Sequence, residues 1–184
     1  YIQTTPLQLC LMTAQIANGG YKIKPHIIYD KNINYENSKL KISKQFINES
    51  LIEKPILQER EFQLYERLYK KAENINFVKD AMFGSTNEQY GTSFKSRYDS
   101  IKYQFAGKTG TSQVKRITEE ERELDLKQSQ IEYKNRDHAL YIAFAPYKEP
   151  RYSISVLVEH GGSGSKAAAP IASKLIKKII DRHK

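Results

Sequence analysis

Residues 138–159 constrain the fold most strongly, because they contain two apolar segments joined by a short turn. The first segment, HALYIAFAPY (138–147), is apolar on both faces, and the second, RYSISVLVE (151–159), alternates aliphatic residues with serines. This pattern predicts an antiparallel β-hairpin. Since an isolated hairpin is only marginally stable in water, other parts of the chain must cover it.

Two flanking segments are suited to cover the hairpin. Residues 103–114 give a third strand signal, and residues 166–184 follow an amphipathic helical pattern. Pro170 is acceptable in that helix only near its start or at a kink. Three strands followed by a helix, with helices before them, predict an α+β fold with an antiparallel sheet. The residues expected to face the core from the last helix are Ile171, Leu175, Ile176, Ile179 and Ile180.

The N-terminal half is predicted to be mainly helical. Residues 4–20 read as one complete helix, with Thr5 as the N-cap, Pro6 at the first helical position and two glycines after Asn18 to end it. A short strand interrupted at Pro25 should follow. The remaining expectations are a helix at 59–72, a second helix within residues 75–85 that ends at Gly84, and polar or charged surface excursions at 31–58 and 115–134.

The chain carries 30 Lys and Arg against 21 Asp and Glu, a formal charge of +9 that would suit an acidic partner. The lysines are scattered, however, and no basic run alternates with stacking aromatics, so a nucleic acid partner is not expected. Cys10 cannot form an internal disulfide and is expected to be a buried, inert thiol. No apolar run approaches the ~18 residues that cross a bilayer. Because the first residue is Tyr1, the chain is interpreted as a piece of a longer protein.

Neither a metal nor a cofactor is expected. The four histidines, His26, His138, His160 and His183, show no paired metal-ligand spacing, and His138 is interpreted as structural. The segment HGGSG (160–164) fits either an anion-binding nest or a tight strand-to-helix turn.

Residues 105–114, FAGKTGTSQV, contain the sequence Lys-Thr-Gly-Thr. The tripeptide Lys-Thr-Gly alone is weak evidence for any function, because it also fits a strand in which a glycine lets another backbone approach. Its context is more specific, since it lies on a predicted strand after small residues and before a hairpin and a C-terminal helix.

Together with this motif, five further segments make the chain resemble the C-terminal part of the transpeptidase domain of class B penicillin-binding proteins, specifically the elongation-type penicillin-binding protein 2. The resemblance leaves only residues 31–58 and 115–134 unmatched. It implies a β-lactamase/transpeptidase-like α+β fold over residues 1–184, with an incomplete sheet of three C-terminal strands plus helices. The segments are YIQTTPLQLCLMTAQIANGG, VKDAMFG, YGTS, RDHALYIAFAPYKEPRYSISVLVEHGGSG and AAAPIASKLIKKII.

The resemblance implies serine acyl transfer on the D-Ala-D-Ala end of a peptidoglycan stem peptide during cell-wall elongation, with β-lactams trapped as a stable acyl-enzyme. The implied partners are the stem peptide, β-lactams and proteins of the cell-elongation complex. The implied location is the periplasmic face of the inner membrane, reached in the full-length protein through an N-terminal anchor that this chain does not carry.

The resemblance also gives roles to four residues. Lys108 would supply positive potential to the cleft, and the hydroxyls of Thr109 and Thr111 would bind the terminal carboxylate of substrate or drug. Gly110 would leave room for the ligand backbone. The N–H of Thr111 would be one of two oxyanion-hole donors.

A nucleophile is harder to find, because the family also needs Ser-x-x-Lys and Ser-x-Asn motifs. Ser38 lies in a charged stretch without an apolar helical face, and Ser85 is much closer to Lys108 than the family pattern allows. We therefore expect no catalytic residue in this chain and no activity from it alone. The literal matches are Ser38 with Lys41, Ser112 with Lys115, Ser163 with Lys166, and Ser85 with Asn87.

Two other functions stay open. The chain could be a non-catalytic interaction fragment of the cell-wall machinery, which a pull-down would reveal. It could also be a basic nucleic-acid-binding domain, which salt-sensitive retention on DNA would support.

Overall fold

Three antiparallel strands form one sheet in the computed structural model of the chain. The predicted hairpin and the third predicted strand are both confirmed, although each strand is shorter than the segment that predicted it. The strand order is β1 (Ala106–Ser112), β2 (His138–Ala145) and β3 (Tyr152–Val158), with β2 in the middle. The structure describes residues 3–25, 27, 66–114 and 130–183.

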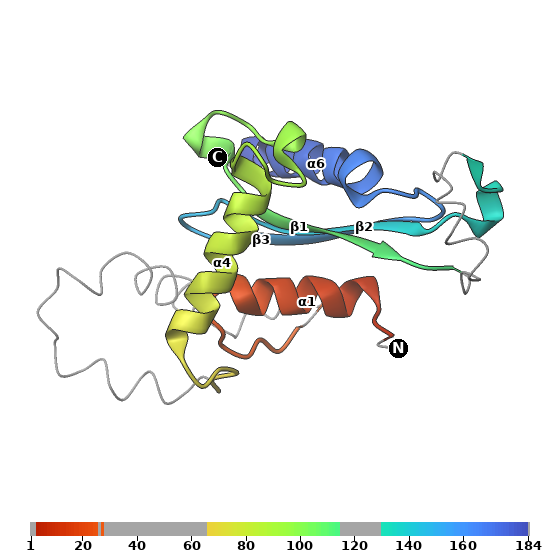
Figure 1. Cartoon of the computed structure of the whole chain (residues 1–184). Helices are drawn as coiled ribbons and strands as arrows, with labels where there is room; N and C mark the ends of the chain where they lie inside the picture. The colour runs from red at the N-terminus through yellow and green to blue at the C-terminus, as the bar shows by residue number, and fades with distance from the viewer. Residues whose placement is uncertain (1–2, 26, 28–65, 115–129, 184) are drawn as a thin grey trace, which may run out of the picture.

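Helices lie on both faces of the sheet (Figure 1). α1 (Pro6–Ala17) packs on one face, mainly against β3, and α6 (Ala169–Arg182) packs on the other. α4 (Ala72–Asn87) crosses the sheet near β1. This arrangement confirms the expected α+β fold with an antiparallel sheet flanked by helices.

The two faces of β2 explain why its sequence is apolar throughout. Successive strand side chains point to opposite faces. Tyr141 and its alternate neighbours pack with α6, whereas Phe144 packs with Ala17 of α1 and Met82 of α4. The buried α6-side core consists of Phe105, Ala139, Tyr141, Ala143, Ala145, Ala168, Ala169, Ala172 and Ile176.

α1 begins and ends as its sequence predicts. The Thr5 hydroxyl accepts the N–H of Gln8, and the Gln8 side chain accepts the N–H of Thr5, which together form a capping box. Gly19 and Gly20 follow the helix at φ 91° and 87°. Cys10 is only half-buried, with its Sγ 3.2 Å from Ser153 Oγ, so the expectation of a fully buried thiol is wrong.

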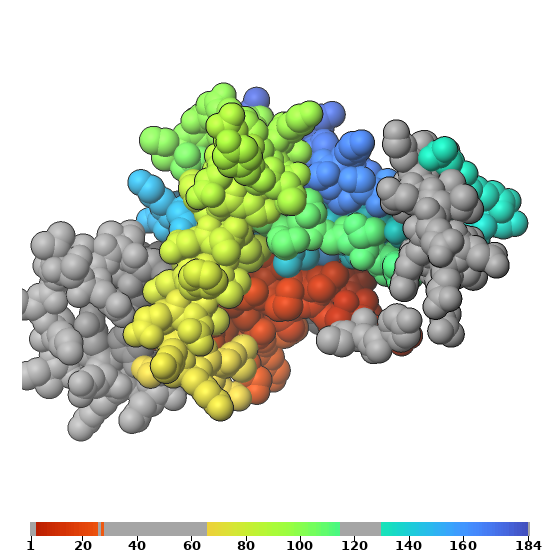
Figure 2. Space-filling model, viewed as in Figure 1, coloured from red at the N-terminus to blue at the C-terminus, as the bar shows by residue number. Residues whose placement is uncertain are grey.

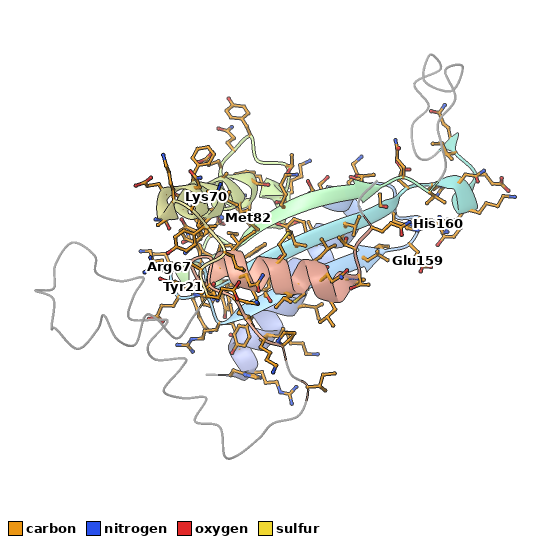
Figure 3. The ribbon with its side chains drawn as sticks, turned by 90° about the horizontal axis from the view of Figure 1, so that it is seen from below. Tyr21, Arg67, Lys70, Met82, Glu159 and His160 are labelled. Atoms are coloured by element: carbon orange, nitrogen blue, oxygen red, sulfur yellow. The ribbon has the colours of Figure 1, made fainter. Side chains whose placement is uncertain are left out.

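The helix expected at 59–72 is wrong for residues 66–71, and Ala72 is already the first residue of α4. Residues 66–69 instead run beside residues 20–22, with Tyr21 and Arg67 forming a β-bridge (Figure 3). The apolar residues in this segment serve local packing, since the ring of Tyr69 stands edge-on against that of Tyr21 at a centroid distance of 6.0 Å. A strand is also expected at 21–30 from the sequence. In the described residues of that segment, 21–25 and 27, only the bridge at Tyr21 is present.

α4 is longer than the predicted helix at 75–85. It starts at Ala72 and continues past Gly84 to Asn87, so Ser85 lies within the helix instead of after it. Gly84 does not end the helix but lies inside it, and the Glu88 carboxyl group lies beside it, with Glu88 Cδ 3.0 Å from the position of an added Cβ.

α6 confirms the position of Pro170 but not the whole predicted core face. A π-helical turn, η5 (Gly164–Ala168), precedes α6, and Pro170 is in its first turn. Ile176 is buried, whereas Ile171 and Leu175 are each 42% exposed. The buried face of α6 therefore combines one predicted aliphatic residue, Ile176, with the small residues Ala169, Ala172 and Ser173.

Among the described residues, β1 and β3 each pair with a strand on one side only. Their outer edges carry backbone N–H and C=O groups that another chain segment or ligand can bind. The prediction of an incomplete sheet is confirmed in this sense. No helix in the described part of the chain is long and apolar enough to span a membrane. The excursion predicted at 31–58 and most of that at 115–134 lie outside the described residues.

Candidate functional site

The four predicted site residues lie side by side on β1. Lys108 pairs with Ile142 of β2, and Thr109 pairs with Tyr141. Since side chains alternate along a strand, Thr109 and Thr111 share one face and Lys108 points to the other. Lys108 and Thr111 are exposed. The two hydroxyls are therefore on the same side of the strand, as the joint binding of one carboxylate would require.

Lys108 keeps its ammonium group beside the motif. Its Nζ donates a hydrogen bond to the backbone carbonyl of Thr109 at 2.8 Å. A positive charge is thus held at the middle of β1, next to the unpaired outer edge of that strand.

Two glycines allow β1 to lie close to the rest of the core. A Cβ on Gly107 would lie 2.3 Å from the hydroxyl oxygen of Tyr141. The backbone of Gly110 is approached by Gly164 of η5, whose added Cβ would lie 2.7 Å from Gly110 O and 2.5 Å from Leu140 O. The close backbone approach thus depends on the missing Cβ of Gly164, whereas a Cβ on Gly110 would meet only the Leu140 side chain.

A chain of hydroxyl groups reaches β1 from α4. Ser85 Oγ is 3.1 Å from Thr92 Oγ1, which in turn is 3.3 Å from Thr109 Oγ1. A second, buried group lies behind it, in which the Tyr141 hydroxyl is 3.0 Å from Thr86 Oγ1 and 2.9 Å from Ser93 Oγ. Burial raises the pKa of Tyr141, so this phenol stays neutral and can share its proton within the group.

An open cavity of about 360 Å³ lies where α4, the segment after it and β1 meet. In Figure 2 the yellow and green surfaces of these elements adjoin one another. Acidic, basic and hydroxyl side chains lie in the cavity wall together with small residues and one tyrosine. Its lining residues are Asp80, Ala81, Gly84, Ser85, Glu88, Tyr90, Gly91, Thr92 and Lys108.

Asp80, in the cavity wall, is held by a tyrosine from the β2–β3 turn. The Tyr147 hydroxyl donates to Asp80 Oδ1 at 2.5 Å, and the Tyr147 ring packs on Phe83 at a centroid distance of 4.2 Å. Burial and the Asp80 carboxylate together raise the pKa of Tyr147 to about 12.

We expect this raised pKa to make the protein less stable at high pH. The unfolded phenol titrates near ~10, so the neutral, hydrogen-bonded form stabilises the fold below that pH and the contribution is lost as pH rises toward about 12. Tyrosinate absorbance is measured against pH for the wild type and for Tyr147→Phe. The difference between the two curves reports Tyr147, and its midpoint should lie near pH 12. Asp80→Asn should lower that midpoint, and a wild-type midpoint already near ~10 would contradict the prediction.

The Ser-x-Asn match at Ser85 and Asn87 has a structural use. The Asn87 amide donates to Phe83 O at 3.0 Å and to Phe105 O at 2.9 Å, which fixes the end of α4 to the residue before β1. Ser112 lies on β1 itself, and Ser163 Oγ is 3.1 Å from Ser165 Oγ. Ser38 lies outside the described residues.

Two histidines that are distant in sequence meet at the other end of the sheet, where Figure 3 labels His160. The His160 backbone N–H donates to His138 Nδ1 at 3.0 Å, and His160 Nδ1 lies 3.1 Å from the Arg136 carbonyl. These bonds support the structural interpretation of His138. In the described part of the chain, no three His, Cys, Asp or Glu side chains gather to form a metal site.

The glycine segment after β3 is a tight turn. The N–H of Gly162 donates to Asp137 O at 2.8 Å, and the N–H of Ser163 donates to Gly161 O at 2.8 Å. Because these amides are already bonded within the protein, the turn interpretation is favoured over an anion-binding nest.

Sequence reasoning did not identify Thr92 as a site residue. Thr92 lies 17 positions before Thr109, and the Gly-Thr dipeptide at 91–92 has no spacing pattern of its own. The only signal was that residues 90–93, YGTS, belong to a segment that resembles the family.

Comparisons with known proteins give one consistent result. Residues 2–177 match the family model described as the penicillin-binding protein transpeptidase domain. Peptidoglycan D,D-transpeptidase MrdA of Salmonella typhimurium is 30% identical over 182 residues, which cover 98% of this chain and 26% of that protein. The homologue from Haemophilus influenzae is 29% identical over 187 residues, 99% of this chain and 24% of its own length. The chain thus spans about a quarter of the length of these relatives.

Solved structures agree with the sequence comparisons. The penicillin-binding protein PBP2 of Helicobacter pylori, in its complex with MreC, matches with a TM-score of 0.65 at 26% identity, covering 98% of this chain and 25% of that one. PBP2 of Pseudomonas aeruginosa in complex with WCK 5153 matches with a TM-score of 0.60 at 28% identity, covering 100% of this chain and 32% of that one.

Proposed function

Since the chain belongs to the penicillin-binding protein transpeptidase domain family, of the PBP2 type that its sequence predicted, we propose that it forms the substrate-binding wall of a peptidoglycan D,D-transpeptidase. In this proposal residues 1–184 are the C-terminal portion of one transpeptidase domain. The observation that carries the proposal is the position of Lys108–Thr111 on a strand whose outer edge is unpaired within the described residues.

The acyl donor would be a stem peptide that ends in D-Ala-D-Ala, lying antiparallel along the outer edge of β1. Its terminal carboxylate would accept hydrogen bonds from the hydroxyls of Thr109 and Thr111, near the positive charge of Lys108. Gly110 would leave space for the ligand backbone, and the N–H of Thr111 would stabilise the oxyanion of the tetrahedral intermediate. The alternation of side chains along β1, with both hydroxyls on one face, supports this assignment.

The nucleophile would come from residues outside these 184. In the reaction, a serine oxygen bonds to the donor carbonyl carbon while the bond to the terminal D-Ala breaks and that residue leaves with a proton. The structural role of Asn87 supports the interpretation that Ser85 and Asn87 are not the Ser-x-Asn motif of the family, because the Asn87 amide is already bonded to two backbone carbonyls.

We predict that the purified 184-residue chain forms no covalent adduct with a labelled β-lactam, because it lacks the serine that the drug acylates. The measurement is a denaturing gel of the chain beside a full-length penicillin-binding protein as positive control. An adduct that disappears in Ser38→Ala but persists in Ser112→Ala would show that the chain holds its own nucleophile.

The partners and location follow the relatives. PBP2 of H. pylori is solved with MreC, so we propose that the full-length protein binds a partner of the MreC type. Its membership of the penicillin-binding protein family supports the proposal that it also binds β-lactams. It would act on the periplasmic face of the inner membrane. Pull-down with the 184-residue chain tests whether it holds partners without the rest of the enzyme.

A further inference from the structure

We propose that Thr92 is a positioning residue for substrate binding, which orients the hydroxyl of Thr109 toward the terminal carboxylate of the acyl donor. The inference rests on the proposed function, since it deepens the role given to Thr109. It is carried by the hydroxyl chain from Ser85 through Thr92 to Thr109, with oxygen–oxygen distances of 3.1 and 3.3 Å.

The backbone around Thr92 is held firmly against α4. The N–H of Gly91 donates to Glu88 O at 2.8 Å, and the N–H of Ser93 donates to Ser85 O at 3.0 Å. The Ser93 hydroxyl donates to the same Ser85 carbonyl at 3.0 Å. A Cβ on Gly91 would lie only 2.4 Å from Ser85 O, so the segment lies in direct contact with the helix. The Thr92 hydroxyl is therefore presented from a fixed support.

The hydroxyls of Ser85, Thr92 and Thr109 can all donate in the same direction, toward the ligand. Each hydroxyl has one proton to donate and can accept at two lone pairs, whereas an ionised carboxylate can only accept. If Ser85 donates to Thr92 and Thr92 donates to Thr109, the Thr109 proton is left for the ligand. A carboxylate selects this direction, because a hydrogen bond to a charged acceptor is stronger than one between neutral groups.

Both distances in the hydroxyl chain are long for O–H···O bonds, so both bonds can shorten when a charged acceptor binds to Thr109. Bonds in a chain polarise one another, so the negative charge at one end should strengthen the whole set. Ser85 and Thr92 also line the cavity beside Lys108, so two of the three hydroxyls in the chain reach this cavity.

The test compares two peptides that differ only at the group Thr109 would bind. An acetylated peptide ending in D-Ala-D-Ala is titrated into the 184-residue chain with a free carboxylate and again as the carboxamide, and both dissociation constants are measured by NMR. We expect the wild type to prefer the carboxylate. Thr92→Val should reduce this preference by about threefold to tenfold, the loss that one modest hydrogen bond produces.

Two variants separate positioning from general structural damage. Thr92→Ser keeps the hydroxyl and should retain the preference within about twofold. Thr4→Val makes the same change at an exposed threonine outside the cavity lining and should alter nothing. A merely structural role for Thr92 would weaken both peptides equally and leave their ratio unchanged, which would overturn the proposal. If Thr92→Val does not fold, Ser85→Ala takes its place and should also lower the ratio.

Thr109→Val separates this inference from the proposed function. If Thr109→Val lowers the preference but Thr92→Val and Ser85→Ala do not, the relay is wrong and the role of Thr109 stands. If Thr109→Val leaves the preference unchanged, or the wild type shows none, the carboxylate-binding role fails and the relay fails with it.

Discussion

Replacing Gly164 with alanine is expected to lower the free energy of unfolding by about 3 kcal/mol or more. The added Cβ would lie 2.5 Å from Leu140 O and 2.7 Å from Gly110 O. Both contacts are with strand backbone, which cannot rotate away as a side chain can. Relief therefore requires η5 to move off the sheet or β1 and β2 to separate, and either change also displaces the motif strand.

Gly110→Ala is the matched control for this prediction. Its Cβ would meet only the side chain of Leu140, at 3.3 Å from Cβ and 3.9 Å from Cδ1. We expect a smaller loss of stability than for Gly164→Ala. Urea unfolding gives both values, and the two midpoints can be compared directly if the slopes agree. Equal midpoints for the wild type and Gly164→Ala would show that η5 does not pack on β1 as described.

Gly107→Ala is expected to have the second largest effect, again about 3 kcal/mol. Its Cβ would lie 2.3 Å from the Tyr141 hydroxyl oxygen and 2.5 Å from Cζ. The clash is with a side chain, but Tyr141 is fully buried and its hydroxyl is bonded to Thr86 and Ser93. The ring therefore cannot move without breaking those bonds and opening the α6-side core.

Tyr141→Phe distinguishes the clash from the hydrogen bonds. Alone, it should cost about 1–3 kcal/mol, because it leaves the Thr86 and Ser93 hydroxyls short of a partner. Combined with Gly107→Ala it should not restore stability, since the ring carbon at 2.5 Å remains. The free energies of unfolding of the wild type, the two single variants and the double variant, measured by heat and by urea, form a double-mutant cycle. Full recovery in the double variant would contradict the packing argument.

These two glycines show that the Lys-Thr-Gly segment depends on packing as well as on chemistry. Gly107 packs against the Tyr141 side chain, and Gly164 packs against the backbone of Gly110. Lys108 and Thr109 are thus held between two close contacts. A variant at either glycine can lose ligand binding simply because the strand has moved, so stability must be measured beside any binding defect.

The sequence predicted the sheet well because its signals are local. Alternation in residues 151–159 and the apolar run in 138–147 each depend on neighbours along one strand, and the intervening turn is short enough to force an antiparallel pair. The ends of α1 were predicted for the same reason, since the Thr5 cap and the glycines after Asn18 act within one turn of the helix.

Errors arose where the periodicity of apolar residues had another cause. Leu68 and Tyr69 fit a helix by spacing but lie in a segment that pairs with residues 20–22. Ile171 and Leu175 fit a core face by spacing, yet each is 42% exposed, while small residues such as Ala172 are buried. The spacing of apolar residues along one element does not determine which other element packs against them. That partner is known only from the tertiary structure.

The sequence by itself determined the three strands, the ends of α1, the motif residues Lys108–Thr111 and the family, because each of these depends on contiguous or regularly spaced residues. Only the tertiary structure decided what surrounds the motif: the hydroxyls of Ser85 and Thr92, the approach of Gly164 to Gly110, and the cavity between α4 and β1. The physical reason is that a hydroxyl contact at 3.3 Å or a backbone approach at 2.7 Å depends on how elements distant in sequence pack together.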